Sequence, residues 1–540
     1  MKRLFAYKPP QKWRLATILL VPVLLGFAHA LGAVRLPLLE RLDLIFYDHV
    51  VRSTMPNTLD GRITIVDIDE SSLERLGHWP WSRDKVAALT LELLNRQQAA
   101  VVGFDLVFAE PDQSSGLDSL QALATGPLQN QKGFQEQLLK LAPQLDYDAQ
   151  LAKALRGRVT VLGYYFTSDR DGQSRGVLPA PALTPKHLRG LPLAATTWNG
   201  HEGNHPIMAQ SAMTAGFFNA ISDADGVVRS MPLLAEYARQ YYESLALAMF
   251  RSAIGRPSVR PIFAQTNAVG AYDTLRALEL QDGARSLLIP VDQQLSTLIP
   301  FRGAPGPAGG SFRYVSAADV VQRALQVAEL RDQIVLVGST APGLQDLRPT
   351  PVSYVYPGVE IHANMLSAVL DGRHSVRPDY AGVFDATQVF FVGLLLVFIL
   401  PWLKPLRAIA VVGVVLALCI SVHLGLLQLQ GLAMPLANVL LMILTMAGMH
   451  LGYGYFFETR AKRKLASIFS TYVPPELVAQ MVQQPERYTM QATHREMTVM
   501  FCDMRGFTAL SEHMQPQQLQ NLLNEVFSRL RNLCITLARL

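Results

Sequence analysis

The strongest constraint on this chain is a stretch at residues 408–457 that contains no Asp, Glu, Lys or Arg. A helix needs about 20 apolar residues to cross about 30 Å of hydrocarbon, so this stretch has room for two spans. Gln428, Gly431 and Pro435 interrupt it with turn formers and side chains that are unfavourable in lipid. The sequence therefore predicts spans at 408–428 and 433–457. Uncharged stretches at 15–34 and 386–403 predict two more.

Basic residues indicate how the four predicted spans are oriented. They concentrate in the tail 1–14, in the loop 404–407 and at 460–464, and cytoplasmic loops carry the excess of Lys and Arg. The prediction is an inner-membrane protein with a cytoplasmic tail at 1–14, a periplasmic region at 35–380 and a cytoplasmic linker at 458–493. The small residues Ala28 and Ala30 also fit a cleaved signal peptide, which leaves the same region outside.

Composition narrows the class further. Hydrophobic residues make up 50% of the chain and charged residues 17%, which is typical of a membrane protein with a large soluble part. The net charge of +5 comes from basic clusters beside the spans. The expected partner of these clusters is therefore the lipid bilayer, and no nucleic acid is expected as a partner. Cys419, Cys502 and Cys534 all lie outside 35–380, so no disulfide can brace that region.

The region 35–380 alternates strand-like and helix-like segments, which favours an α/β layered domain. Residues 216–234 differ, because the turn-forming DADG at 223–226 separates two short extended runs and predicts an antiparallel hairpin. The polar stretch 111–143 predicts an inserted helix or a flexible loop. The remaining expected elements are buried strands at 63–69, 99–108, 159–166 and 333–338, and helices at 82–98, with Ser82 as N-cap, and 148–155.

Carboxylates gather where these strands end. Ligands of open α/β sheets bind beyond the carboxyl ends of the strands, so these residues are candidates for contact with an unknown ligand. The alternative is that they cap helices and form ordinary turns. The candidates are Asp67, Asp69, Asp105, Glu110, Asp223, Asp225, Glu360 and His362.

Several short motifs resemble the CHASE2 domain, an extracytoplasmic sensory module. The resemblance spans about residues 39–371 and implies an α/β sensor followed by three spans and an intracellular signalling domain. It does not name the stimulus. The motifs are VDID at 66–69, GHWPWSR at 77–83, GFD at 103–105, FAEP at 108–111, GFFN at 216–219, DADGVVR at 223–229, VLVGSTA at 335–341 and GVEIHAN at 358–364.

The cytoplasmic end carries a second motif. Residues 495–503 predict an apolar strand that ends in Asp503, and residues 504–508 turn into a helix from Ala509 onward. A carboxylate beside a helix N-terminus suits a metal-bound triphosphate, because free amides contact phosphate oxygens and the carboxylate binds the metal. The alternative is that an Asp shortly before Gly only forms a turn.

FCDMRGFT at 501–508 resembles the opening of class III adenylate and guanylate cyclase catalytic domains, as do YVPP at 472–475, LLN at 522–524 and Phe527. The resemblance implies that Asp503 and the Met504 carbonyl bind Mg²⁺ or Mn²⁺. It also implies that the amides of Gly506, Phe507 and Thr508 contact the triphosphate of ATP, and that the protein is a homodimer. The family's second metal aspartate, purine-selecting residues and transition-state residues are expected beyond Leu540, so no complete catalytic set is assigned.

These observations together predict a bacterial transmembrane CHASE2 receptor of the adenylate cyclase type. In this prediction residues 494–540 form the incomplete start of an α/β class III cyclase domain that makes cAMP from ATP under control of an external signal. The alternative is a non-catalytic membrane sensor whose cyclase segment only dimerises.

Overall fold

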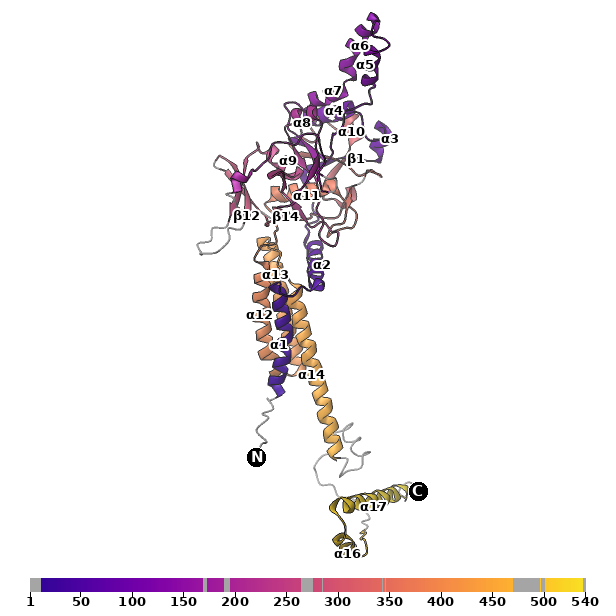
Figure 1. Cartoon of the computed structure of the whole chain (residues 1–540), viewed down its shortest axis with the longest axis vertical. Helices are drawn as coiled ribbons and strands as arrows, with labels where there is room; N and C mark the ends of the chain where they lie inside the picture. Colours follow the sequence, from indigo (N-terminus) through magenta and orange to yellow (C-terminus); the bar gives the residue numbers. More distant parts are fainter. Residues whose placement is uncertain are drawn as a thin grey trace. The chain divides into compact units, whose positions relative to one another are not determined.

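The computed structural model describes residues 11–168, 172–188, 195–263, 275–283, 285–341, 343–344, 346–469, 496 and 501–537. The chain forms two compact units, residues 1–457 and residues 458–540, and each is described by itself. The first unit contains an α/β region and a helical bundle (Figure 1).

A mainly parallel sheet forms the centre of the α/β region, in the order β15-β1-β16-β2-β3, with β7 also parallel to β3. β6 extends the sheet antiparallel to β3, and β4 pairs with β6. The strands are β1 (Asp60–Ile68), β2 (Val101–Phe104), β3 (Thr160–Thr167), β4 (Ser174–Arg175), β6 (Gly200–Glu202), β7 (Thr214–Phe217), β15 (Phe312–Ser316) and β16 (Ile334–Ser339). This confirms the predicted layered α/β domain.

Helices cover both faces of the sheet, because successive strand residues point to opposite sides. Ile65 and Leu336 pack into the core with α9 (Leu245–Ala253) and α11 (Gly358–Asp371). Val66 and Val337 pack into the other core. That second core includes side chains of α4 (Arg83–Leu91), α7 (Tyr147–Leu155), α8 (Pro206–Ser211) and α10 (Ala317–Val321), and α3 (Glu70–Leu76) packs at its edge.

Two glycines allow the first cover layer to approach the sheet. A Cβ on Gly216 of β7 would lie 2.6 Å from the Leu245 Cα, and one on Gly338 of β16 would lie 2.6 Å from the Val359 side chain. Both distances are shorter than real Cβ contacts, so α9 and α11 could not sit here above any larger residue.

Smaller elements surround this sheet. The predicted inserted segment forms two helices, α5 (Leu117–Thr125) and α6 (Lys132–Leu145), which project from one end of the α/β region (Figure 1). The minor sheets are β10-β9-β5, β11-β12-β13, β14-β8 and β17-β18. Their strands are β5 (Thr197–Trp198), β8 (Ser230–Pro232), β9 (Leu234–Tyr237), β10 (Gln240–Glu243), β11 (Ser258–Phe263), β12 (Leu275–Asp282), β13 (Arg285–Pro290), β14 (Ser296–Leu298), β17 (Leu347–Arg348) and β18 (Tyr356–Pro357).

Three local predictions need correction. The hairpin at 216–234 shrinks to one antiparallel bridge between Ile221 and Ser230, because β7 joins the main sheet and β8 pairs with the distant β14. The strand at 99–108 is only Val101–Phe104, since its neighbour β3 pairs with just those central positions. The helix at 82–98 continues from α4 into a π-helical turn at Glu92–Arg96, and Ser82 makes no side-chain capping bond.

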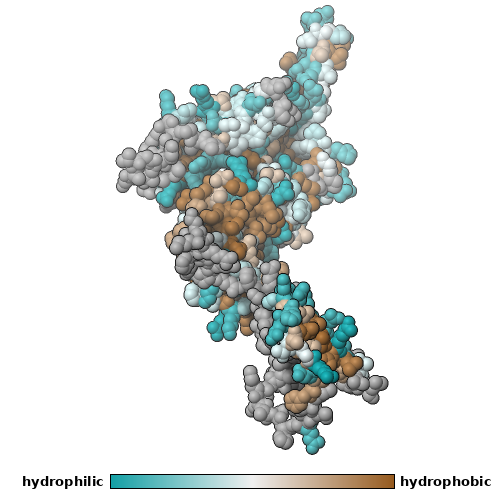
Figure 2. All heavy atoms as spheres, turned by 60° about the horizontal axis from the view of Figure 1, so that its bottom comes forward, coloured by the Kyte–Doolittle hydropathy of each residue, from teal (hydrophilic) through white to brown (hydrophobic). Residues whose placement is uncertain are grey.

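Four helices are long and apolar enough to cross a membrane, as predicted. They are α1 (Gln11–Ala30), α12 (Ala381–Ile399), α13 (Pro405–Gln430) and α14 (Ala437–Phe469), with a short 3₁₀ turn at Leu400–Trp402 after α12. Two further 3₁₀ turns, Pro185–Leu188 and Pro307–Gly309, lie in the α/β region. Their apolar side chains form a broad hydrophobic surface, in contrast to the mixed surface of the α/β region (Figure 2). Residues 31–34, predicted as part of the first span, form a turn instead, because Gly32 has a positive φ of 75° and ends the helix.

The bundle holds a buried polar contact among three spans. The Asn438 side-chain amide of α14 donates to the Gly26 carbonyl of α1 at 3.0 Å and to the Asp385 carboxyl of α12 at 2.7 Å. At the other end, the Lys12 ammonium lies 3.8 Å from the centroid of the Trp402 ring. The start of α1 therefore lies at the same end of the bundle as Trp402, which lies just before the 404–407 loop.

The second unit contains α16 (Phe507–Glu512) and α17 (Pro516–Leu537). The predicted strand at 495–503 is wrong in its described part, because residues 501–503 are not in a strand and the Phe501 side chain is 93% exposed. A strand requires a paired neighbour, and no strand lies in the described residues of this unit. The predicted linker 458–493 is described only to residue 469, where it continues α14 as a helix, and YVPP at 472–475 lies outside the described residues.

Candidate functional site

Asp67 and Asp69 at the end of β1 hold neighbouring elements together. The Asp67 carboxylate accepts the Thr340 amide at 2.8 Å and the Thr340 hydroxyl at 2.5 Å, which ties β1 to the loop after β16. Asp69 is the N-cap of α3 and accepts the Ser72 amide at 2.8 Å. Both contacts support the capping and turn alternative, not ligand binding.

Asp105 and His362 meet at the same edge of the sheet. The Asp105 carboxylate follows β2 and lies 4.0 Å from His362 Nε2 on α11. Burial raises the pKa of Asp105 to about 7, and the Asp346 carboxylate adds to the effect. Burial lowers the pKa of His362 to about 4, partly offset by the Phe218 carbonyl. Near pH 6 both groups are therefore mostly neutral.

Glu360 is fully buried and does not join this pair. Its carboxylate accepts the Gly306 amide at 2.7 Å, the Tyr314 hydroxyl at 2.9 Å and the Tyr356 hydroxyl at 3.2 Å. Burial raises the pKa of Glu360 to about 7, although these donors counteract it. Glu110 belongs to neither group: its side chain is 80% exposed and lies 4.0 Å from Arg175.

Asp223 and Asp225 bind a buried arginine that sequence reasoning did not select. The side chain of Arg229 is 2% exposed, and it donates to Asp223 at 2.8 Å and to Asp225 at 2.8 and 2.9 Å. It also forms a bidentate pair with Asp48, at 2.7 and 2.8 Å. Asp48 lies on α2 (Pro37–Thr54), so this cluster joins the 223–229 turn to the helix that follows the first span. The motif containing Arg229 was recognised, but its partner in α2 has no sequence signal nearby.

A second carboxylate of α2 reaches the membrane bundle. Asp43 accepts the backbone amides of Leu436 and Ala437, both at 2.7 Å. These amides belong to the first turn of α14, which has no earlier carbonyls to pair with. α2 therefore contacts both the α/β region and the helix that leads to the second unit.

In the second unit, the motif residues form a turn before a short helix. Asp503 is exposed and accepts the Met504 amide at 2.8 Å, and the Met504 carbonyl accepts the Phe507 amide at 3.3 Å. Gly506 occupies the N-cap of α16 with a φ of 79°, a backbone conformation that favours glycine. Phe507 and Thr508 begin the helix, so Asp503 lies in the turn that directly precedes the first-turn amides of α16.

This arrangement fits part of a metal-triphosphate site. Asp503 offers one exposed carboxylate, but among the residues that the structure describes no three His, Cys, Asp or Glu side chains lie close enough to hold a metal ion. The Met504 carbonyl is already engaged in the turn. The described residues thus show no complete metal site around Asp503.

Two known protein families match this chain, one in each unit. Residues 17–401 match the CHASE2 domain, which covers more than half of the chain. The chain belongs to the CHASE2 family. This match takes in the α/β region and the helices α1 and α12 on either side of it. Residues 489–538 match the adenylate and guanylate cyclase catalytic domain. No curated protein and no solved structure matches the chain. The protein is therefore a CHASE2 membrane sensor joined to a partial class III cyclase domain.

Proposed function

We propose that this CHASE2 protein is a receptor whose outer domain controls the formation of a cyclic nucleotide, cAMP from ATP, by a class III cyclase domain. The proposed organisation follows the sequence boundaries, with residues 35–380 in the periplasm and residues 1–14 and 458–540 in the cytoplasm of an inner-membrane homodimer. The observation that carries the proposal is α14, one uninterrupted helix from Ala437 to Phe469. It begins where Asp43 of α2 meets it and ends in the segment that precedes the cyclase match.

The proposed chemistry is attack of the ribose 3′-hydroxyl on the α-phosphate, which releases diphosphate. Asp503 and the Met504 carbonyl would hold Mg²⁺ or Mn²⁺, which stabilises charge on the reacting oxygens. The amides of Gly506, Phe507 and Thr508 would bind the triphosphate at the start of α16. The remaining catalytic groups of the family are not among the described residues, so this segment contributes one side of a site.

The alternative is a non-catalytic sensor whose cyclase segment only dimerises. It is favoured by the described residues, among which no three His, Cys, Asp or Glu side chains lie close enough to hold a metal ion. The two functions differ in whether Asp503 affects nucleotide turnover, and that difference can be measured directly.

The test begins with the coding sequence downstream of the codon for Leu540, read in all three frames. Membranes from cells that express the complete reading frame are then assayed for cyclic nucleotide with Mg-ATP, Mn-ATP and Mg-GTP. We expect cAMP formation that falls at least 100-fold in Asp503→Asn, because a metal-bound transition state loses its ligand. Glu512→Gln, an exposed charge change in the same unit, is the control and should keep full activity. Cyclic nucleotide that is absent, or insensitive to Asp503→Asn, would reject the enzyme in favour of the non-catalytic sensor.

A further inference from the structure

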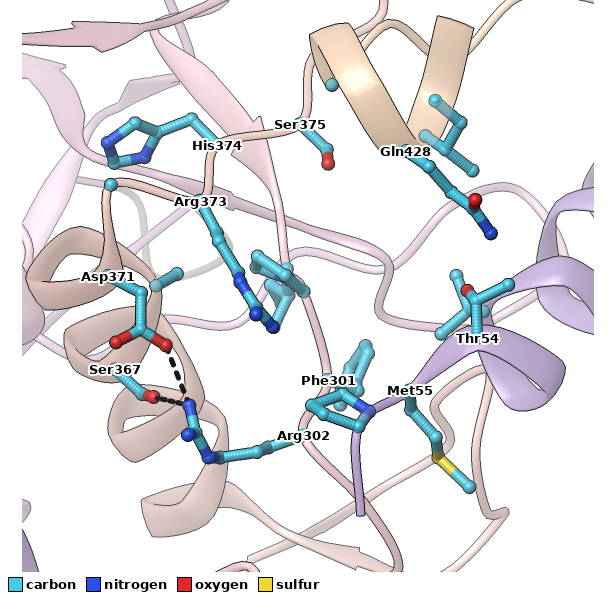
Figure 3. Close-up of a pocket in the computed structure, with 18 of the residues that line it drawn as sticks. Thr54, Met55, Phe301, Arg302, Ser367, Asp371, Arg373, His374, Ser375 and Gln428 are labelled. Carbon is cyan, nitrogen blue, oxygen red and sulfur yellow. Dashed lines mark hydrogen bonds and ion pairs between the residues drawn. The ribbon is translucent and has the colours of Figure 1, made fainter. Parts of the chain in front are cut away.

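A cavity of about 610 Å³ lies where the α/β region meets the bundle. Its walls come from α2 and the residues after it, the end of β13, residues 299–302, the C-terminal end of α11 with residues 372–375, and the last turn of α13 (Figure 3). Small-molecule sites in proteins usually enclose about 300–1,000 Å³. The cavity therefore has the size of a site for a small organic ligand.

Charged side chains beside the cavity balance one another, with one exception. Arg302 pairs with Asp371 at 2.8 Å, and Arg62 bridges Asp371 at 2.6 Å and Asp60 at 2.7 Å. Burial opposes ionisation of Asp60, but hydrogen bonds from Arg62 and Ser367 outweigh it and lower its pKa to about 2. Both carboxylates are thus ionised at neutral pH, and the two arginines match them.

Arg373 is the exception. Its side chain extends from the end of α11 into the middle of the cavity (Figure 3). In the described parts of the chain no carboxylate pairs with its guanidinium, and the hydrogen bond found for this residue is that of its backbone amide to the Ala368 carbonyl. Gln428 and Thr54 face it from the opposite walls, and Met55 and Phe301 provide apolar surface. The cavity therefore combines one unmatched cation with neutral hydrogen-bonding groups and apolar walls.

We propose that this cavity binds an amphiphilic anion, a carboxylate or phosphate joined to an apolar chain. Arg373 binds the anionic group, since a guanidinium forms strong charge-assisted bonds with carboxylates and phosphates. The Gln428 amide donates a further hydrogen bond, and the apolar walls bury the chain. A soluble organic acid and an anionic lipid of the adjoining leaflet share this chemistry.

The cavity lies next to the segment that contacts the turn before α14. The Ser375 carbonyl accepts the Leu298 amide at 2.7 Å, and the Val376 amide donates to the Gly431 carbonyl at 2.8 Å. The contact with Gly431 is close, because a Cβ there would lie 2.0 Å from the His374 carbonyl oxygen. Residues 374–376 are thus held between β14 and the turn that precedes α14. An anion on Arg373 acts beside this segment, and its role as a stimulus rests on the receptor function proposed above.

Binding is tested on the full chain in nanodiscs, without reference to nucleotide formation. In phosphatidylcholine nanodiscs, hexanoate is titrated by saturation-transfer NMR, with hexanamide as the uncharged probe. Separately, nanodiscs that contain phosphatidylglycerol are analysed by native mass spectrometry for retained lipid. We expect Arg373→Gln to weaken binding of the anion at least about 10-fold, the usual effect of losing a charge-assisted bond. Arg377→Gln removes the same charge from the same linker outside this cavity and should stay within about twofold.

The outcomes separate the two sources. Saturable hexanoate binding that depends on Arg373 identifies a soluble acid, and retained phosphatidylglycerol that depends on Arg373 identifies a lipid. Arg373→Lys keeps the charge and should retain most of the binding, which distinguishes loss of the charge from misfolding. The proposal is overturned if neither anion binds, if hexanamide binds as well as hexanoate, or if the Arg373 and Arg377 variants are equally affected. Anion binding without any change in cyclic nucleotide formation would retain the cavity assignment and count against the receptor function.

Discussion

Replacing Arg229 with Met tests the ionic cluster that joins α2 to the 223–229 turn of the α/β region. The Met side chain has a similar length but leaves the Asp48, Asp223 and Asp225 carboxylates without their cation. Asp48 has a 12% exposed side chain, whereas Asp223 and Asp225 are 35% and 34% exposed. Water can solvate the latter two, so most of the destabilisation should come from Asp48.

The expected size follows from these exposures. Removing one partner of a buried ion pair costs about 3–5 kcal/mol, whereas an exposed pair contributes only about 0–1 kcal/mol. We take about 3 kcal/mol, since Asp48 is not fully buried. Separation of α2 from the 223–229 turn should become easier by that amount. Every 1.4 kcal/mol is about a factor of ten, so amide protection in α2 should fall about 100-fold.

The assay is hydrogen–deuterium exchange of the full chain in nanodiscs, followed on peptides that cover α2. Arg156→Met is the matched control, because Arg156 is exposed at the end of α7 and the same substitution there should leave α2 unchanged. The double variant Arg229→Met with Asp48→Asn removes both charges of the buried pair. It should recover part of the protection, because no buried unpaired charge remains at that position.

Two results would refute this reasoning. If α2 keeps its protection within about threefold in Arg229→Met, the ionic cluster does not hold the helix. If the double variant exchanges as fast as the single variant, the loss comes from packing and not from the unpaired charge of Asp48.

Two further predictions concern the sheet. Burial raises the pKa of Asp105 from 3.8 to about 7, so the fold favours the neutral carboxyl, and this group should make the wild type less stable as pH rises from about 4 to 7. Asp105→Asn should reduce that slope, and Glu360, whose pKa burial also raises to about 7, should account for a remaining part. Parallel melting-temperature curves for the two proteins against pH would contradict this assignment. Gly216→Ala should destabilise the fold by about 1–3 kcal/mol, because its Cβ would overlap the backbone of Leu245. Gly133→Ala in α6, where the added Cβ meets open space, should instead be neutral or stabilising by about 0.5–1 kcal/mol. Equal melting temperatures for the two alanine variants would show that the close approach of α9 does not constrain residue 216.

Local patterns in the sequence were sufficient for the framework of this fold. Uncharged stretches predicted the four long helices, and short buried strands such as that at 333–338 appear close to their predicted places. These predictions succeed because the pattern of apolar and polar residues along an element depends directly on whether each of its sides faces lipid, water or the protein core. The strand expected before Asp503 failed because a strand also needs a neighbour, which an apolar stretch does not provide by itself.

The candidate sites were harder to predict because their partners are distant in sequence. Asp223 and Asp225 were selected as isolated carboxylates, whereas the structure places them around Arg229 with a residue 181 positions away, Asp48. Asp69 was a candidate ligand contact because it follows a strand, and in the structure the same residue caps α3. The Arg373 cavity was missed, since its walls come from five separate segments and no one of them has an unusual composition.

Two carboxylates of α2 attach this helix to two different parts of the first unit. Asp43 and Asp48 are five positions apart, which places them about 7.5 Å apart along the axis and about 140° apart around it. Asp43 holds the first turn of α14, and Asp48 holds Arg229 of the α/β region. Because the attachments lie on different faces, α2 cannot rotate about its axis without breaking at least one of them. Under the receptor function proposed above, we therefore expect a displacement of the 223–229 turn to move α2 and the start of α14 together, and the cavity around Arg373 has α2 as one of its walls.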